Sequence, residues 1–271
     1  MPAVSREACR PPLAGGFTLT ELAVVLVIVA LLVGSLLVPL TAQIDIRNRA
    51  DTRAAMAEIR EALLGFVAAN GRLPCPAAAT LVSDAGNAGS ELAPLVNGRC
   101  TDLNGAATEV GVLPWVTLGV KETDAWGRRY SYRVTQQFAS SVAPATPPAF
   151  GWPAPCTAAN PLNTAFVLCS TGTLNVRAVA GAPVGGVIAA QLPVVIVSHG
   201  KNGNGAFTPQ GAQLPAGADA DEQDNQLTNG GMNMANVDFV SRTPTATFDD
   251  EVVWISRLLI FNRLITIGKL P

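Results

Sequence analysis

The order of apolar and polar residues divides the chain into stretches that differ in how often apolar residues recur. Residues 17–40 are apolar apart from a single acidic side chain, Glu21, and they carry no other charge. As a helix rising 1.5 Å per residue, this run would reach about 36 Å, more than the roughly 30 Å of a hydrocarbon core. The pattern therefore predicts a transmembrane helix over 17–40.

A helical pattern continues beyond the apolar run. Over residues 41–70, apolar positions recur every three or four residues with charged residues between them, which is typical of an amphipathic helix. Asn70 and Gly71, followed by Pro74 and Pro76, mark its end. We expect one long helix with a transmembrane first half and an amphipathic second half.

The remaining residues, 71–271, are expected to form a globular head. Glycine, proline, alanine and asparagine become frequent there, and short alternating runs predict strands between loops. Loops are predicted over 143–161 and 200–236, whereas 258–267 fits either a helix or a strand. The expected fold class is α+β, a long N-terminal helix packed on an antiparallel sheet. The predicted strands are 129–135, 166–170, 175–179, 194–198 and 252–256.

Residues 1–16 form a short leader before the apolar run. Its two arginines and one glutamate sum to a side-chain charge of +1, and positive flanks stay on the cytoplasmic side of a membrane. A secretory signal peptide cut near Ala42 and an ordinary single-span anchor are the alternatives. Neither explains Glu21, because an acidic side chain within an apolar helix is costly and marks a functional site by default.

The N-terminal motif GGFTLTE occupies residues 15–21 and opens the apolar run. It resembles the N-terminus of the type IV pilins and the pseudopilins of type II secretion. The resemblance implies cleavage by a prepilin peptidase between Gly16 and Phe17 and N-methylation of the new Phe17 amine. It also implies assembly into a filament, where Glu21 of one subunit pairs with the Phe17 amine of a neighbour. Because a buried charge is stable only with its partner, this pair would set the register of assembly.

Three motifs of the head strengthen the resemblance. The segment TDAWGRRY, residues 123–130, is similar to the turn that enters the head sheet of major pseudopilins, with Ala125 in place of a proline. The segment VVIVSHG, residues 194–200, is similar to a strand and the glycine turn that follows it in that family. The segment FDDEVVW, residues 248–254, is similar to the acidic turn at the last strand. The resemblance thus implies a pilin-like head.

The resemblance also implies a location and partners. The chain is expected to cross the bacterial inner membrane once, with its head in the periplasm. The expected partners are other pilin or pseudopilin subunits, the inner-membrane assembly platform, the prepilin peptidase and the inner membrane. The alternative function is a single-pass membrane-anchored periplasmic protein whose Gly/Asn-rich loop captures a ligand. Substitution of Glu21 separates the two functions, because only filament assembly depends on that residue.

The cysteines predict disulfides. Cys9 would leave with the leader, so four cysteines remain, and an even number in an exported head indicates a disulfide framework with three possible pairings. Pairing by proximity joins Cys75 to Cys100 and Cys156 to Cys169. A zinc site is disfavoured because the chain has no Cys-x-x-Cys motif and only one histidine.

Charge and motifs argue against nucleic-acid binding and catalysis. The chain has 18 Lys and Arg against 20 Asp and Glu, with no basic tract, so no nucleic-acid partner is expected. Ser198 and His199 are adjacent, but there is no Gly-x-Ser-x-Gly motif and no assignable acid partner. Residues 200–203 contain Gly and Lys without the spacing of a phosphate-binding loop. We expect a structural subunit and not an enzyme.

Acidic residues of the head form a candidate metal site. Ca²⁺ takes six to eight oxygen ligands. The arrangement resembles that of several pseudopilins, which bind calcium between a head loop and the last turn. A solvated acidic loop is the alternative, because the spacing does not match an EF-hand. No other cofactor is expected. The candidate calcium ligands are Asp219, Asp221, Glu222, Asp249 and Asp250.

Overall fold

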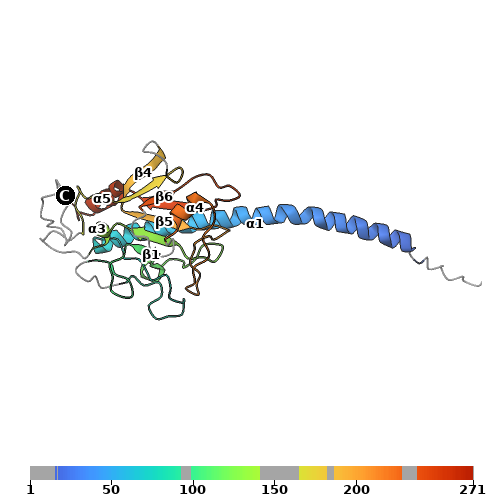
Figure 1. Ribbon diagram of the computed structural model, residues 1–271, viewed down its shortest axis with the longest axis horizontal. Helices are drawn as coiled ribbons and strands as arrows, with labels where there is room; N and C mark the ends of the chain where they lie inside the picture. Colours follow the sequence, from blue (N-terminus) through green and yellow to red (C-terminus); the bar gives the residue numbers. More distant parts are fainter. Residues whose placement is uncertain are drawn as a thin grey trace, which may run out of the picture. The chain divides into compact units, whose positions relative to one another are not determined.

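The chain divides into two compact units, Met1–Ile46 and Arg47–Pro271. The first helix, α1 (Leu19–Asn70), begins in the first unit, and its remainder belongs to the second. Figure 1 shows the elements of the computed structural model. The structure describes residues 16, 18–92, 99–140, 165–181, 186–227 and 237–270, without the side chains of 35–41.

Short strands and short helices follow α1 in the second unit. The strands are β1 (Val110–Val112), β2 (Ser131–Val134), β3 (Leu174–Arg177), β4 (Val187–Leu192), β5 (Val194–Ser198), β6 (Asp238–Val240) and β7 (Glu251–Ile255). The helices are α2 (Trp115–Leu118), α3 (Gln136–Ala139), α4 (Ala220–Asn225) and α5 (Arg257–Thr266).

The strands form two sheets. The larger has the order β1-β2-β5-β7, and all its neighbouring strands are antiparallel. Its register places Tyr132 of β2 opposite Ile196 of β5, which in turn lies opposite Val253 of β7. The smaller sheet has the order β4-β3-β6, with β3 antiparallel to β4 and parallel to β6. The expected α+β class with an antiparallel sheet is confirmed.

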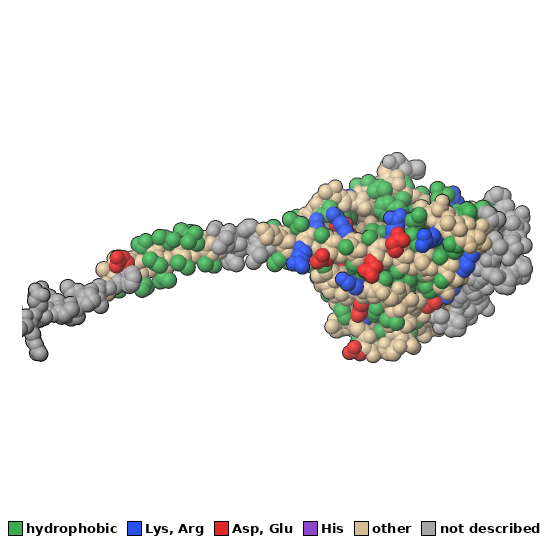
Figure 2. Space-filling model, turned by 180° about the vertical axis from the view of Figure 1, so that it is seen from behind, with side chains coloured by type: hydrophobic (Ala, Val, Ile, Leu, Met, Phe, Trp, Pro, Cys, Tyr) green, Lys and Arg blue, Asp and Glu red, His purple; other side chains and the backbone are tan. Residues whose placement is uncertain are grey.

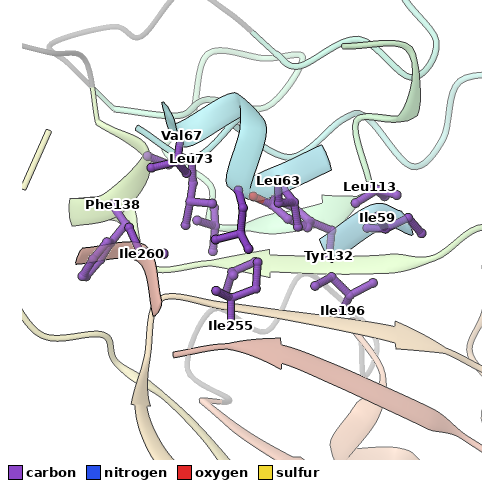
Figure 3. Close-up of a cluster of buried hydrophobic side chains, with 14 of the residues drawn as sticks. Ile59, Leu63, Val67, Leu73, Leu113, Tyr132, Phe138, Ile196, Ile255 and Ile260 are labelled. Atoms are coloured by element: carbon purple, nitrogen blue, oxygen red, sulfur yellow. The ribbon is translucent and has the colours of Figure 1, made fainter. Parts of the chain in front are cut away.

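The amphipathic part of α1 packs on the larger sheet within the second unit. Its buried side chains recur every three or four residues, as expected for one helix face. Ile59, Leu63 and Val67 belong to one buried cluster with Tyr132 and Ile255 of the sheet. Figure 3 shows these side chains between the helix and the strands, with Ile260 of α5 closing one end of the cluster. This cluster is the main core of the head.

Strand β5 is buried on both faces. Val194 and Ile196 belong to the cluster under α1, whereas Val195 and Val197 belong to a second cluster with side chains of β3 and β6. Successive side chains of a strand point to opposite faces of the sheet, so an uninterrupted apolar run is what a strand covered on both sides requires. The smaller sheet therefore covers the face that α1 leaves open.

The end of α1 follows the sequence signal. Gly71 adopts φ of 69°, and its N–H donates to the carbonyl of Val67 at 2.8 Å. A glycine in the left-handed conformation satisfies a terminal carbonyl of the helix and turns the chain away. The Asn70-Gly71 stop is confirmed.

The apolar start of α1 requires a correction. In the described part of the chain, no helix is long and apolar enough to cross a membrane. The expected transmembrane first half is therefore wrong. So is the expected single-pass location in the bacterial inner membrane with a periplasmic head.

Most predicted strands are found, with some exceptions. The predicted strands 129–135, 175–179, 194–198 and 252–256 correspond to β2, β3, β5 and β7. Residues 166–170 contain a turn and no strand, and 258–267 is helical as α5. The predicted loop 200–236 contains the short helix α4, while β1, β4 and β6 were not predicted. The loop predicted over 143–161 lies outside the described residues.

Candidate functional site

Three buried carboxylates meet at one end of the larger sheet. Glu222 lies on α4, and Asp249 and Asp250 directly precede β7. One ligand atom from each lies within 4.8 Å of those from the other two, and all three side chains are buried. We call Glu222, Asp249 and Asp250 the carboxylate cluster.

Asp249 is held by the turn that follows β5. Its Oδ2 accepts hydrogen bonds from the backbone N–H groups of Lys201 and Asn202, both at 2.9 Å. Gly200 makes this approach possible. It has φ of 55°, and a Cβ there would lie 2.4 Å from the carbonyl oxygen of Asp249. Glycine at the end of the VVIVSHG motif is thus required by both backbone conformation and space.

Side-chain amides hold the other two carboxylates. Glu222 accepts from Asn202 Nδ2 at 2.5 Å and from Asn204 Nδ2 at 2.7 Å. Asp250 Oδ2 accepts from Asn225 Nδ2 at 2.9 Å. These bonds join α4, the turn after β5 and the start of β7 into one polar network.

The carboxylate cluster contains buried oxygen atoms without a hydrogen-bond partner among the described residues. Asp249 Oδ1 and Asp250 Oδ1 are buried, and neither has a hydrogen-bond partner among the residues described. Burial raises the pKa of Asp250 well above its ordinary value, and the charges of Glu222 and Asp249 raise it further. Buried acids at this separation are stable only with a bound proton or a nearby cation.

The carboxylate cluster offers the kind of ligand atom that Ca²⁺ prefers, which is a hard oxygen donor. Two of its carboxylate oxygens have no hydrogen-bond partner among the described residues, and the third carboxylate lies within 4.8 Å of them. The side-chain carbonyl oxygen of Asn202 accepts from the backbone N–H of Asn204 at 3.0 Å, which holds the two asparagines together beside Glu222. Glu222, Asp249 and Asp250 would hold the ion, and the ion would neutralise their mutual repulsion.

The structure places the five predicted calcium ligands in two groups. Glu222, Asp249 and Asp250 form the cluster, whereas Asp219 and Asp221 bind the guanidinium of Arg242. Asp219 also caps α4, because its side chain accepts from the backbone N–H of Asp221 at 3.0 Å. An aspartate at the start of a short helix could have been read as an N-cap from the sequence.

Asparagines that support the cluster were not predicted. Asn202, Asn204 and Asn225 follow strand β5 or end α4, and each amide donates to a cluster carboxylate. Asn225 also bonds both backbone groups of Val240, at 2.9 and 2.7 Å. The sequence did contain a signal, because asparagines are frequent in 200–236. That enrichment was interpreted only as the composition of a loop.

Ser131, His199 and Asp250 lie next to one another at the carboxylate cluster. His199 Nε2 lies 2.7 Å from Ser131 Oγ, and its Nδ1 lies 3.8 Å from Asp250 Oδ1. Burial lowers the pKa of His199 to about 4, with a smaller effect from the charge of Arg128. Ser131 is only 1% exposed, so its hydroxyl has no route to a substrate. The arrangement supports packing of the sheet and offers no accessible nucleophile.

The turn at residues 123–130 is built around a buried aspartate. Asp124 Oδ1 accepts from the backbone N–H groups of Trp126 and Arg128, at 2.9 and 3.0 Å, and its Oδ2 accepts from Ser198 Oγ at 2.7 Å. Gly127 has φ of 78°. The motif is therefore a tight turn that fixes the chain entering β2 against the end of β5.

One of the expected disulfides is present. Cys75 and Cys100 are joined with an S–S length of 2.00 Å and a Cα–Cα distance of 5.4 Å, and both are fully buried. Cys169 is also disulfide-bonded. Cys156 lies outside the described residues. The Cys75–Cys100 pairing is confirmed.

The N-terminal motif forms a helix cap. Glu21 Oε2 accepts from the backbone N–H and the hydroxyl of Thr18, both at 2.9 Å, and Thr18 Oγ1 accepts from the N–H of Glu21 at 3.3 Å. This reciprocal pattern is a capping box, Thr-x-x-Glu, which sequence reasoning overlooked. The two bonds from Thr18 lower the pKa of Glu21. Gly16 precedes the cap, and Phe17 lies outside the described residues.

Apolar side chains surround the helix after this cap. Large side chains from Leu22 to Val33 are about half exposed or more, and they occupy every side of the helix. Figure 2 shows this apolar surface along the start of α1. A helix that is apolar all round is stable only when other chains or another apolar phase cover it.

Comparisons with known protein families, with curated proteins and with solved structures found no match to this chain.

Proposed function

We propose that this chain is a structural subunit of a type II secretion pseudopilus or a type IV pilus. A prepilin peptidase would cut it between Gly16 and Phe17. The chain would then assemble with other pilin or pseudopilin subunits, on an assembly platform, through its N-terminal helix. It would act as a building unit and not as an enzyme.

The observation that carries the proposal is the apolar surface on every side of residues 19–34. Valine, leucine and isoleucine side chains there are 48–88% exposed, which leaves their burial to other molecules. Burial contributes roughly 25 cal/mol for each Å² of apolar surface, so packing several such helices side by side is strongly favourable. A filament core made of identical helices covers all sides of each one.

Glu21 has two roles to separate. Within one chain it completes the capping box with Thr18. In a filament it would also pair with the cationic amine of Phe17 from a neighbour, and this pair would select the correct register. The first role needs a hydrogen-bond acceptor, whereas the second needs a negative charge.

Glu21→Gln and Thr18→Ala separate these roles. Glutamine keeps the capping box but removes the charge, and Thr18→Ala removes the cap but keeps the charge. We expect Glu21→Gln to abolish filament assembly and Thr18→Ala to preserve it, measured as the fraction of the protein recovered in sheared filaments. Mass spectrometry of the wild type should show a chain that begins at a methylated Phe17. Normal assembly of Glu21→Gln, or a different N-terminus, would refute the proposal.

We also propose that the head binds one Ca²⁺ at Glu222, Asp249 and Asp250. The two carboxylate oxygens without partners, Asp249 Oδ1 and Asp250 Oδ1, support this site. The ion would tie α4 to the start of β7 and so stabilise the head for assembly.

A further inference from the structure

Asparagine followed directly by glycine recurs along the chain. In such a pair the backbone nitrogen of the glycine can attack the side-chain amide of the asparagine, because the two groups lie close together and glycine has no side chain to hinder the approach. Two pairs, at 97–98 and 229–230, lie outside the described residues. The described pairs are Asn70–Gly71, Asn104–Gly105, Asn202–Gly203 and Asn204–Gly205.

The glycine is buried in three of these four pairs. Gly71, Gly203 and Gly205 are buried, whereas Gly105 is exposed. The space around the glycines differs in the same way. A Cβ on Gly203 would overlap the side chain of Arg128, but a Cβ on Gly105 would meet no atom within 4 Å. Of the four glycines, Gly105 therefore has the most room for a new ring and for attack by water.

The asparagine side chain is held in the same three pairs. The amides of Asn202 and Asn204 donate to Glu222 at 2.5 and 2.7 Å. The amide of Asn70 donates to a backbone carbonyl of α1 at 3.0 Å. Asn104 is exposed, and its side chain makes no hydrogen bond to a described residue. Its amide can therefore turn toward the backbone nitrogen of the next residue.

Asn104 lies at the tip of an exposed turn. Thr101 pairs with Ala107 across this turn, and Gly105 adopts φ of 81°. The N–H of Gly105 donates to the carbonyl of Asp102 at 3.1 Å. This bond must open before the nitrogen can react. Hydrogen bonds of an exposed turn open at a much lower cost than those of a packed core.

We propose that Asn104 is a site of spontaneous deamidation. The backbone nitrogen of Gly105 forms a bond to Cγ of Asn104, and the side-chain amide leaves as ammonia with the proton that the glycine nitrogen gives up. Water then opens the resulting succinimide at either of its two carbonyls, which gives aspartate or isoaspartate. The inference goes beyond the proposed function and does not depend on it.

Deamidation changes the charge and the backbone of the turn. Asp102 Oδ1 now accepts from the N–H groups of Asn104 and Ala106, at 2.8 and 2.9 Å. Either product places a second carboxylate two residues from Asp102, and isoaspartate also lengthens the backbone by one carbon atom. Each modified chain gains one negative charge on a formal net charge of −2. The turn should loosen while the core stays intact, because residues 103–107 are exposed.

Peptide mapping of the full-length chain tests the inference. The folded protein is incubated at pH 8, then reduced and digested with trypsin. Peptide 100–121 contains Asn104 as its single asparagine, and peptide 61–72 contains Asn70 as its own. Deamidation raises the mass of a peptide by about 1 Da. We expect peptide 100–121 to gain this mass about tenfold faster than peptide 61–72, because a held amide and a buried glycine rarely reach the geometry of attack. Asn202 and Asn204, followed by fragmentation of their peptide, should be as slow as Asn70.

The unfolded chain is the matched control. In urea with the disulfides reduced, the four pairs lose their different surroundings, so their rates should agree within about threefold. Asn104→Gln should remove the mass increase from peptide 100–121 of the folded protein, because the longer side chain closes a ring far more slowly. An Asn104 that reacts no faster than the other three in the folded chain would overturn the inference. So would an equal preference for Asn104 in urea. Neither result bears on filament assembly or on calcium, so the proposed function would stand.

Discussion

Asp250 Oδ1 lies 3.8 Å from His199 Nδ1, and neither atom has a hydrogen-bond partner in the described residues. Burial raises the pKa of Asp250 and lowers the pKa of His199 to about 4, so burial disfavours the charged form of each group. Burial therefore opposes an ion pair between this acid and this base. A cation at the carboxylate cluster would allow Asp250 to ionise, which links the calcium proposal to stability.

Calcium is expected to stabilise the full-length chain. At a calcium concentration a hundred times the dissociation constant, binding adds about 2.7 kcal/mol to the free energy of unfolding. For a chain of this size the melting temperature should rise by about 5–10 °C. Differential scanning calorimetry with Ca²⁺ and with EDTA measures the effect, and equal melting temperatures would refute the calcium site.

Two substitutions distinguish the carboxylate cluster from the acidic loop. Asp249→Asn should remove the rise in melting temperature caused by calcium, because Asp249 belongs to the cluster. Asp219→Asn should retain the rise, because Asp219 binds Arg242 and caps α4. If Asp219→Asn also removes the response, the ligand set is the larger one expected from the sequence.

His199 should make stability sensitive to mild acid. In the unfolded chain its pKa is about 6.5, whereas in the folded chain it is lowered to about 4. As the pH falls through this window the unfolded chain binds a proton before the folded chain does. Stability present above pH 6.5 is thus lost toward pH 4, by about 3 kcal/mol for this residue. Urea unfolding in EDTA at pH 7.0, 5.5 and 4.5 measures the loss.

The control for this pH dependence is His199→Gln. Asp250 acts in the opposite direction, because its raised pKa adds stability as the pH falls, and it is present in both proteins. The difference between wild type and His199→Gln therefore isolates the histidine. Identical pH slopes in the two proteins would contradict the prediction.

Loss of the Cys75–Cys100 disulfide should destabilise the head. The two cysteines are 25 residues apart and buried, so their removal frees a long loop in the unfolded chain. Replacing both by serine should reduce the free energy of unfolding by about 3 kcal/mol. Cys9→Ser, in the predicted leader, should leave it unchanged. Urea unfolding of the three proteins provides the comparison.

The contact of α1 with the sheet can be tested by a pair of truncations. Leu63 is fully buried between the helix and the strands, whereas Leu258 of α5 is 69% exposed. Leu63→Ala should lower the free energy of unfolding by about 2–5 kcal/mol because it leaves a cavity. Leu258→Ala should change it by less than about 0.5 kcal/mol. Similar effects of the two substitutions would argue against this packing.

Several elements could be predicted because their signals are local. The end of α1 depends on Gly71, which alone accepts the left-handed conformation at low cost. Strand β5 was predicted with its observed bounds, Val194–Ser198, because a strand buried on both faces is continuously apolar. The strands β1 and β6 were missed because each has only three residues and is defined by its partners.

The candidate site was only partly predictable for the same reason. The sequence pointed to acidic residues in two segments, but nothing in their spacing showed that Glu222 would join Asp249 and Asp250. That choice follows from the position of α4 beside the start of β7, which Asn225 secures through its bonds to Val240 and Asp250. Asp221, next to Glu222 in the chain, is instead held by Arg242.

The sequence alone determined the apolar character of the N-terminal run, the stop of α1 at Gly71 and most of the predicted strands, and it favoured Cys75–Cys100 among three possible pairings. Such features depend on neighbouring residues, or on a short loop that closes easily. Only the tertiary structure decided which acids form the carboxylate cluster. Only the structure, too, removed the expected membrane span. Contacts between distant segments are properties of the folded chain and not of a local pattern.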